Sequence, residues 1–390
     1  MKLFRVMSFV ALSCALAAQG VTAACAGGVE TVRRLHAEYT KVREEAQKEL
    51  RTFGDDARKV ERGSEQHKEL SAHMSRARSR CAAPQQAFER AFRAADWALF
   101  DPTRDGALLR DGLLCAAQDA EPPQRAVAAG QLYLRYFDGD AAAARMRCQT
   151  LPMALLRTDQ PEAAKALLTQ ALDAANVGSK AGILLMLGDI AAASRRLAEA
   201  TRYYGVAEAA ADENTKRFVV LRKNLIGRPA PVLDCRQWMG AEAKSLASMK
   251  GKVVLIDFWA TWCAPCRRVM LALDEMYGAH RSEGLEVIGI TRFYNRGYMP
   301  ADRTQMQWGG EGVQDLTLES FAEHVATFRK NTGIRYPFVI GDEEDFKNYG
   351  VSGIPTLAVV DRDGTIALLS VGAGSEPLLE LAIRNLLANR

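Results

Sequence analysis

The sequence lacks a large excess of charge of either sign. It has 51 Lys and Arg residues against 47 Asp and Glu residues over 390 positions, which gives a net charge of +4. No block of basic residues stands out, so the composition does not indicate a nucleic-acid-binding protein. With 25% charged and 48% hydrophobic residues, the chain also differs from disordered proteins. At roughly 100–200 residues per domain, its length predicts two or three folded domains.

Long hydrophobic runs are absent as well. The most apolar stretch extends from Val6 to Ala18, which is shorter than the roughly 20 residues of a membrane-spanning helix. Two basic residues precede this stretch, and small residues follow it up to position 24, which is the layout of a secretory signal. We therefore expect residues 1–24 to be a signal peptide and the mature protein to be exported, to the periplasm. A retained membrane anchor and a lipid-modified Cys25 are the alternatives.

Eight cysteines are too few for a disulfide-scaffold protein of this length. Removal of the signal takes one of them and leaves seven, so at least one thiol is unpaired or pairs transiently. Five of the seven lie outside the motif described below, and any four of them allow three connectivities. The arrangement that we consider pairs Cys115 with Cys148 and Cys25 with Cys81, and leaves Cys235 as the odd thiol.

The first half of the chain has few β-branched residues. Residues 25–226 are rich in Ala, Arg, Glu, Gln and Leu, which favour helices, so we predict an all-helical domain over this range. Small and large residues alternate around Leu187–Ala207 as in a tetratricopeptide helix hairpin, and residues 151–171 repeat much of the pattern. An irregular helical domain fits this pattern equally well. Either kind of domain usually binds a protein partner or mediates dimerisation.

Strand and helix patterns alternate after the Gly227–Pro231 turn, so residues 227–390 form a second predicted domain. An apolar strand, a helix and a second strand over residues 252–291 form a βαβ unit with parallel strands. A further helix is predicted at 321–331 and a terminal helix at 376–389. Later strands are predicted at 337–340, 356–361 and 365–371, the last two as a hairpin. The fold class is therefore α/β, with a central sheet flanked by helices.

The chemistry is expected where the first strand of that unit turns into its helix, at Cys263-Ala264-Pro265-Cys266. A cysteine at a helix N-terminus faces unpaired N–H groups and the positive end of the helix dipole, which favour its thiolate. Cys263 is therefore predicted to be the exposed nucleophile. Cys266 lies one turn later on the same face, where it can resolve a mixed disulfide. Pro265 suits the first turn of a helix.

Three other interpretations of the CxxC motif are weaker. A zinc site needs a second Cys/His pair, and the five histidines show no such spacing. A c-type haem site needs a histidine where Arg267 stands. A purely structural disulfide at an exposed helix start would be easily reduced. We therefore expect redox chemistry that requires no organic cofactor or metal.

The run Val254–Cys266, with Asp257-Phe258-Trp259-Ala260 before the CxxC and Gly353-Ile354-Pro355-Thr356 after it, resembles the thioredoxin superfamily. Within it, residues 228–390 are similar to the TlpA/ResA-like exported thiol-disulfide oxidoreductases. The resemblance implies that Pro355 is a cis-proline facing the CxxC and that the Ile354 backbone pairs with an extended substrate beside Ala264 and Pro265. It also implies that Trp262 flanks the disulfide and that Asp257 is a buried acid.

A carboxyl group in an apolar strand is expected to have a raised pKa, so Asp257 is suited to take the proton from Cys266. A hydrogen-bonded core acid without a kinetic role is the alternative for Asp257, and simple surface packing is the alternative for Trp262. The chain departs from the ResA-like pattern at Val269, where those reductases carry a glutamate. The segment Arg292–Glu311 is longer than a minimal thioredoxin fold needs, and we expect it to form a lip over the disulfide or to pack on the helical domain.

The predicted function is an exported thiol-disulfide oxidoreductase, a reductase of protein disulfides that receives electrons from a membrane-bound or soluble donor. A helical partner-binding scaffold with a redox-sensitive thioredoxin module is one alternative. A thiol peroxidase is another, although such enzymes usually place Thr-x-x-Cys at this helix start, where here Cys263 takes the position of the threonine.

Overall fold

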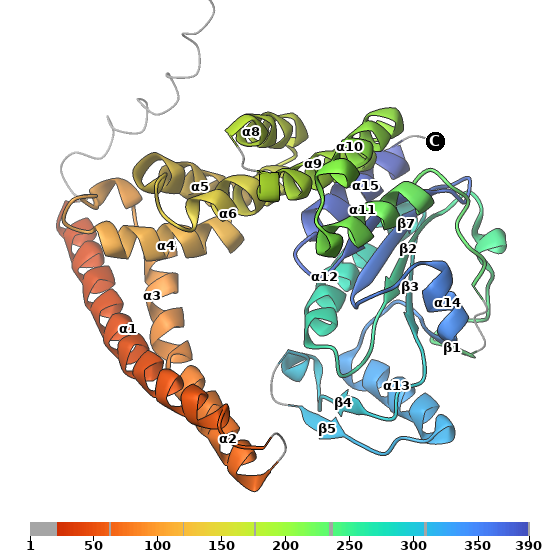
Figure 1. Ribbon diagram of the computed structural model, residues 1–390, viewed down its shortest axis with the longest axis horizontal. Coiled ribbons are helices and arrows are strands. Elements are labelled where there is room, and N and C mark those ends of the chain that lie inside the picture. Colours follow the sequence, from red (N-terminus) through yellow and green to blue (C-terminus); the bar gives the residue numbers. More distant parts are fainter. Residues whose placement is uncertain are drawn as a thin grey trace, which may run out of the picture. The chain divides into compact units, whose positions relative to one another are not determined.

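A computed structural model describes residues 22–61, 64–119, 121–174, 177–233, 237–307 and 310–388 (Figure 1). Most of the predicted signal, residues 1–21, lies outside this range. The chain divides into two compact units, of which the first ends at Ala154 and the second begins at Leu155. The predicted boundary between residues 226 and 227 lies inside the second unit, where helices give way to strands. As a domain boundary it stays a prediction.

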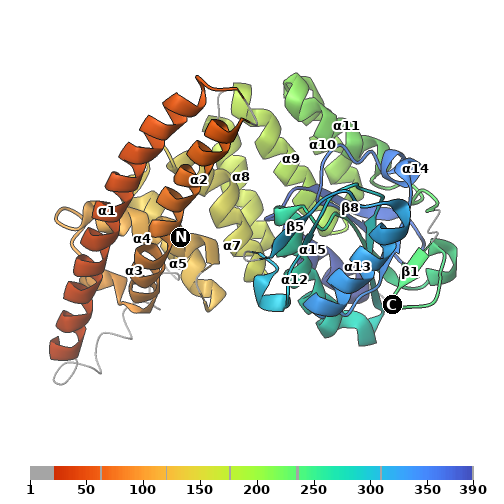
Figure 2. The ribbon, with the colours of Figure 1, turned by 90° about the horizontal axis from the view of Figure 1, so that it is seen from below.

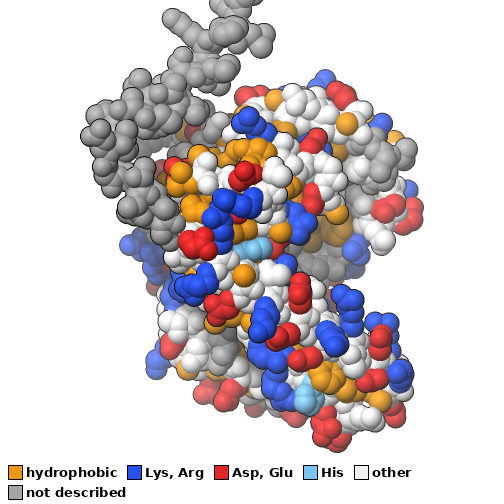
Figure 3. Space-filling model, turned by 90° about the vertical axis from the view of Figure 1, so that its left-hand side faces the viewer, with side chains coloured by type: hydrophobic (Ala, Val, Ile, Leu, Met, Phe, Trp, Pro, Cys, Tyr) orange, Lys and Arg blue, Asp and Glu red, His pale blue; other side chains and the backbone are white. Residues whose placement is uncertain are grey.

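The first unit is helical, as predicted. Its helices are α1 (Thr22–Ala57), α2 (Glu65–Arg80), α3 (Ala82–Ala94), α4 (Gly106–Asp119), α5 (Pro123–Phe137) and the short α6 (Ala143–Arg145), with single turns η1 (Trp97–Leu99) and η2 (Met146–Thr150). Arg33 of α1 donates hydrogen bonds to both carboxylate oxygens of Asp105 at 2.9 Å, and Arg43 of α1 donates to Asp111 of α4 at 2.8 Å. Basic and acidic side chains are interspersed over the face of this unit in Figure 3. Polar contacts therefore supplement a core built around Phe88 and Phe92.

The second unit begins with helices α7 (Leu151–Arg157, which starts in the first unit), α8 (Pro161–Ala174), α9 (Val177–Ala193), α10 (Leu197–Ala210) and α11 (Glu213–Leu225). A Cβ atom on Gly188 of α9 would lie 2.4 Å from the ring of Tyr204 of α10, so this position accepts only glycine at the present helix spacing. The small and large residues of the predicted hairpin thus meet at the α9–α10 contact. Membership of the tetratricopeptide class stays a prediction.

The second unit continues with a six-stranded sheet in the order β1-β6-β3-β2-β7-β8. The strands are β1 (Gln237–Met239), β2 (Val253–Phe258), β3 (Leu285–Thr291), β6 (Phe338–Ile340), β7 (Thr356–Val360) and β8 (Ile366–Val371). β2, β3 and β6 are parallel to one another, whereas β1, β7 and β8 are antiparallel to their neighbours. The predicted βαβ unit and the β7–β8 hairpin are confirmed. The short edge strand β1 was not predicted.

Helices α12 (Ala264–His280), α13 (Leu318–Thr332), α14 (Glu343–Asn348) and α15 (Glu376–Ala388) accompany the sheet, with turns η3 (Leu246–Met249), η4 (Arg281–Glu283) and η5 (Arg303–Gln305). Helices α12 and α15 contact each other and the sheet (Figure 1, Figure 2). A separate two-stranded sheet, β4 (Gly297–Met299) with β5 (Glu311–Val313), lies within the predicted 292–311 segment and extends two residues past it.

Helix α9 and the sheet region share one core. Asn385 of α15 donates a hydrogen bond to the carbonyl of Ala193 at the end of α9, 3.0 Å away, and Gly227 N–H bonds the carbonyl of Ile366 in β8 at 2.8 Å. Arg384 of α15 forms an ion pair with Asp159, 3.0 Å away. Residues 155–226 therefore belong structurally with the sheet.

A buried charged cluster joins α9, α10 and α11. Arg222 donates to both carboxylate oxygens of Asp189, at 2.7 and 2.9 Å, and the Tyr204 hydroxyl donates to the same carboxylate at 2.8 Å. Arg222 is 5% exposed and Asp189 is 6% exposed. Because a buried charge that loses its partner keeps its full desolvation cost, the cluster fixes how the three helices pack.

We predict that Asp189→Ala lowers the free energy of unfolding by about 3–5 kcal/mol, since it leaves the Arg222 guanidinium buried and unpaired. Urea denaturation of the full chain measures the change. Glu213→Ala on α11 is the matched control, because its ion pair with Lys216 is exposed and its loss is expected to change stability by about 0.5 kcal/mol or less. A loss below about 1 kcal/mol for Asp189→Ala would contradict the account of the cluster.

Candidate active site

The two cysteines of the CxxC motif form a disulfide at the start of α12, where the chain leaves β2. Their Cα atoms are 5.3 Å apart. Cys263 is the N-cap of α12, and the backbone N–H of Cys266 donates to its sulfur at 3.2 Å. Cys263 is 3% exposed and Cys266 is fully buried. The predicted placement at a helix N-terminus is therefore confirmed, but the prediction of an exposed Cys263 is wrong for the disulfide form.

Pro355 lies across from this disulfide because β7 pairs with β2. The Ile354–Pro355 peptide bond is cis, and Thr356, which begins β7, is paired with Phe258 at the end of β2. The carbonyl oxygen of Ile354 is 3.7 Å from the Cys263 sulfur. A backbone acceptor thus stands directly beside the reactive sulfur. Ala264 is half-buried and Pro265 is exposed, so both border the same surface.

Asp257 lies within β2, in register with Gly289 of β3 and Leu357 of β7. It is fully buried, and neither carboxylate oxygen has a hydrogen-bond partner among the described residues. Burial raises the pKa of Asp257 to about 8, because the charged form loses its hydration. The predicted raised pKa is confirmed. The alternative, a hydrogen-bonded core acid, is not supported, because the Asp257 carboxylate has no hydrogen-bond partner in the described part of the chain.

Trp262 immediately precedes Cys263 and is half-buried. The ring of Tyr294 meets it edge-on, with centroids 5.3 Å apart, and the guanidinium of Arg296 lies 4.7 Å above its ring. Both partners come from the 292–311 segment. The described part of this segment therefore packs on Trp262, the residue that precedes Cys263.

Arg267 joins the 292–311 segment to the CxxC helix. It is 4% exposed, and it donates to the carbonyls of Met306 at 2.5 Å and Thr261 at 2.7 Å. Its guanidinium also lies 3.7 Å above the ring of Tyr298. Sequence reasoning did not assign it this role, because an arginine after a CxxC is ordinarily read as part of the solvent-facing side of the helix.

Thr261 and His324 form a second link that sequence reasoning missed. The Thr261 hydroxyl lies 3.0 Å from Nε2 of His324, and it accepts a hydrogen bond from the Tyr298 N–H at 3.2 Å. Burial lowers the pKa of His324. A Cβ on Gly297 would lie 2.2 Å from His324 Nε2, so the glycine permits this close approach. In the sequence, the signal for this close contact is Gly297, placed directly before the aromatic Tyr298.

The remaining cysteines do not form the disulfides that we considered. Cys81, Cys115 and Cys148 form no disulfide in the described part of the chain. The pairing of Cys115 with Cys148 is therefore wrong: Cys115 lies on α4, where its sulfur accepts a hydrogen bond from Arg93, 3.1 Å away, and Cys148 lies in η2. Cys81 contacts the carbonyl of Val42 instead of a second sulfur. The side chain of Cys25 and all of Cys235 lie outside the described residues.

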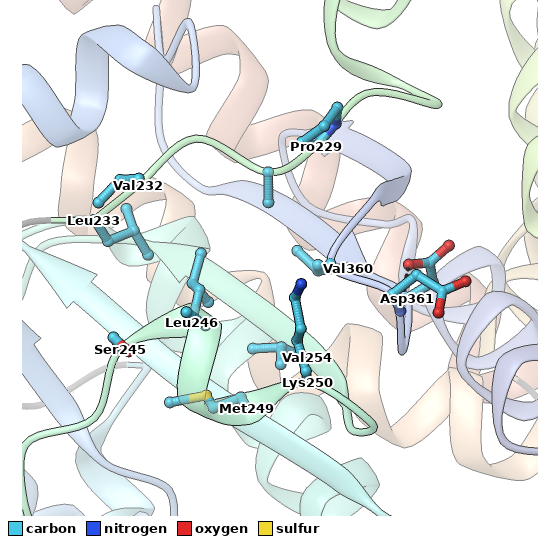
Figure 4. A pocket seen from close by; sticks show the side chains of 14 residues that line it. Pro229, Val232, Leu233, Ser245, Leu246, Met249, Lys250, Val254, Val360 and Asp361 are labelled. Atoms are coloured by element: carbon cyan, nitrogen blue, oxygen red, sulfur yellow. Dashed lines mark hydrogen bonds between the residues drawn. The ribbon is translucent and has the colours of Figure 1, made fainter.

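A cavity of about 340 Å³ lies at the opposite end of β2 from the disulfide (Figure 4). It is lined mainly by apolar side chains, with Lys250 and Asp361 at its edge. Val254 at the start of β2 and Val360 at the end of β7 contribute to its wall, so it does not reach Cys263.

Among the described helices, none is both long and apolar enough to cross a membrane.

Comparison with known proteins identifies the region that carries the six-stranded sheet and the CxxC motif. Residues 227–383 match the Redoxin family. Thiol-disulfide oxidoreductase ResA of Geobacillus thermodenitrificans is 28% identical over 148 residues, which cover 38% of this chain and 70% of the relative. ResA of Bacillus thuringiensis (strain Al Hakam) is 27% identical over 164 residues, which cover 42% and 79% respectively.

Solved structures align with the same region at low overall superposition scores. A thioredoxin family thiol:disulfide interchange protein from Chlorobium tepidum TLS is 25% identical with a TM-score of 0.30, and covers 41% of this chain and 97% of its own. A thiol-disulfide isomerase from Corynebacterium glutamicum is 22% identical with a TM-score of 0.32, and covers 41% and 98% respectively. By the family match, residues 227–383 form a Redoxin domain, and this region of the chain is similar to the ResA thiol-disulfide oxidoreductases.

Proposed function

We propose that this chain is an exported reductase of protein disulfides that uses Cys263 and Cys266 as its redox pair. The observation that carries the proposal is the position of the Cys263 sulfur. It caps α12, accepts the N–H of Cys266 and faces the carbonyl beside cis-Pro355. A helix N-terminus stabilises a thiolate, and the thiolate is the form that attacks a disulfide.

The reaction proceeds through a mixed disulfide. In the reduced protein the Cys263 thiolate attacks one sulfur of a substrate disulfide, so that a bond forms between Cys263 and the substrate while the other substrate sulfur leaves as a thiolate. The Cys266 thiol then loses its proton and attacks the Cys263 sulfur, which releases the second substrate thiol. Two electrons pass to the substrate, and the protein ends with the Cys263–Cys266 disulfide. An external dithiol donor, membrane-bound or soluble, must reduce it again.

Asp257 supplies the base for the second step. A general base is most effective when its pKa lies near the working pH, and burial brings the pKa of Asp257 to about 8. Its carboxylate has no hydrogen-bond partner among the described residues, so it remains available to accept the Cys266 proton, through a water molecule. This role follows from its chemistry and its place in β2.

Substrate binding uses the backbone beside the disulfide. The Ile354 carbonyl accepts a hydrogen bond from an extended substrate segment, and Ala264, Pro265 and Trp262 form the surrounding contact surface. Helices of the residue 25–226 region bind a partner or a second copy. Residues 1–24 direct the chain to the periplasm, where an electron donor keeps the pair reduced.

We predict that reduced Cys266→Ser accumulates mixed disulfides with oxidised proteins, because the first attack proceeds and the second cannot. Non-reducing electrophoresis of an extract mixed with the purified variant, followed by mass spectrometry of the Cys263 peptide, measures the adducts. Cys263→Ser is the matched control and is expected to form few adducts at the CxxC motif, since Cys266, the remaining cysteine of that motif, is fully buried. Equal trapping by both variants would contradict the assignment of Cys263 as nucleophile.

A second prediction concerns the pH dependence of stability. Asp257 has a pKa of about 8 in the folded protein, against about 3.9 in an unfolded chain, so the folded state holds one more proton between these values. Stability therefore falls as the pH rises through this window. From pH 5 to pH 7.5, the free energy of unfolding of the oxidised protein is expected to fall more steeply than that of Asp257→Asn, by up to about 1.4 kcal/mol per pH unit.

Urea denaturation at several pH values measures both slopes. Asp363→Asn, at the exposed β7–β8 turn, is the control and is expected to keep the steep slope. Stopped-flow release of the second substrate thiol tests the kinetic role, and Asp257→Asn is expected to slow it by roughly 100-fold or more. Parallel stability curves for the wild type and Asp257→Asn would refute the raised pKa, and an unchanged release rate would refute the kinetic role.

A further inference from the structure

One exposed positive charge of the 292–311 segment lies over Trp262, next to the CxxC motif. Arg296 is exposed, and its guanidinium lies 4.7 Å above the ring of Trp262, the residue that precedes Cys263. In the described part of the chain no carboxylate forms an ion pair with it, and this includes Glu311 and Asp315, which lie 15 and 19 residues later in the sequence. Its charge is therefore open to a molecule that approaches Cys263.

Two neighbouring arginines, Arg292 and Arg267, differ from Arg296 in this respect. Arg292 forms an ion pair with Glu343, and buried Arg267 already donates to two carbonyl groups. Arg268, which is exposed on α12, resembles Arg296, because it has no ion pair among the described residues. Asp257 is fully buried and forms none. The surface beside the CxxC thus presents two uncompensated guanidinium groups.

The backbone that carries Arg296 is held firmly against the CxxC region. Its neighbour Gly297 begins β4 and packs against His324 and Thr261, and the next N–H, that of Tyr298, donates to Thr261. Farther along the segment, Arg303 forms an ion pair at 3.0 Å with the buried Asp274 of α12. These contacts fix the position of Arg296 relative to the disulfide.

Stacking on Trp262 also restricts the guanidinium itself. An arginine over an indole ring keeps its planar edge, with its N–H donors, free to bind a carboxylate in two parallel hydrogen bonds. Because Trp262 is joined directly to Cys263, such a carboxylate would belong to a residue close to the substrate cysteine. A lysine at the same place would offer neither the stacking nor the paired donors.

We propose that Arg296 selects substrates in which an acidic residue lies beside the cysteine to be reduced. The inference rests on the proposed reductase function and names its substrate class, an acidic disulfide-bonded peptide segment. Arg296 acts as a specificity residue and takes no part in the transfer of electrons or protons. Charges at the rim of a binding interface act mainly on the rate of association. The preference is therefore expected in the second-order rate constant for the attack of Cys263 on the substrate disulfide.

The test compares three disulfides with the reduced full chain in single turnover. Two are peptide disulfides of identical sequence, except that glutamate or lysine flanks the cysteine, and the third is an uncharged small disulfide. The wild type is expected to react roughly fivefold faster with the glutamate peptide than with the lysine peptide at low salt. The difference is expected to shrink at about 1 M salt, where charges are screened beyond about 3 Å.

Substitutions at position 296 then test whether Arg296 causes the preference for the glutamate peptide. Arg296→Glu is expected to reverse it, Arg296→Gln to abolish it and Arg296→Lys to retain only part of it, while the rate with the uncharged disulfide stays within about twofold of the wild type. Arg281→Glu is the matched control, since Arg281 is exposed at the far end of α12, about 25 Å along the helix, and is expected to leave the preference intact.

The outcomes separate this inference from the proposed function. If the wild type reduces all three disulfides but treats the two peptides alike, or if Arg296→Glu and Arg281→Glu change the preference equally, the role of Arg296 is refuted and the reductase stands. If the reduced wild type reacts with none of the three, the reductase function fails and the inference fails with it.

Discussion

The rest of the site depends on one contact, the cap that the Cys263 sulfur provides for helix α12. The Cys266 N–H points at this sulfur from 3.2 Å, so the first turn of the helix is completed by the reactive atom itself. The sheet makes this possible, because β2 ends where α12 begins and β7 brings the Ile354 carbonyl to 3.7 Å from the same sulfur. Nucleophile and resolving cysteine therefore share one strand-to-helix turn, and the backbone acceptor that precedes β7 lies beside it.

Burial behind that turn sets the proton chemistry. Asp257 is the next-to-last residue of a fully buried strand, and its carboxylate finds no hydrogen-bond donor among the described residues. The protein tolerates an acid there because a protonated carboxyl costs far less to bury than a charged one. The same desolvation that weakens folding at higher pH gives the group a pKa at which it can exchange a proton with Cys266.

Local patterns predicted the turn well and long-range packing poorly. The apolar run into the CxxC predicted the β2–α12 turn, because such a turn depends on neighbouring residues, whereas the cis bond at Pro355 was expected from the resemblance to the thioredoxin superfamily. Arg267 could not be assigned, since its carbonyl partner Met306 lies 39 residues away. The absence of a disulfide at Cys115 and Cys148 in the described part of the chain, and the division of the chain at residue 154, depend likewise on helix packing that composition does not specify.

The most direct test of the account is the alkylation rate of Cys263 in the reduced protein as a function of pH. Mass spectrometry compares this rate with that of Cys81, a half-buried thiol at the junction of α2 and α3. A thiolate stabilised by the first turn of α12 is expected to react at a lower pH than Cys81 and than an unstructured thiol. A Cys263 that reacts only in the pH range of an unstructured thiol would contradict the account.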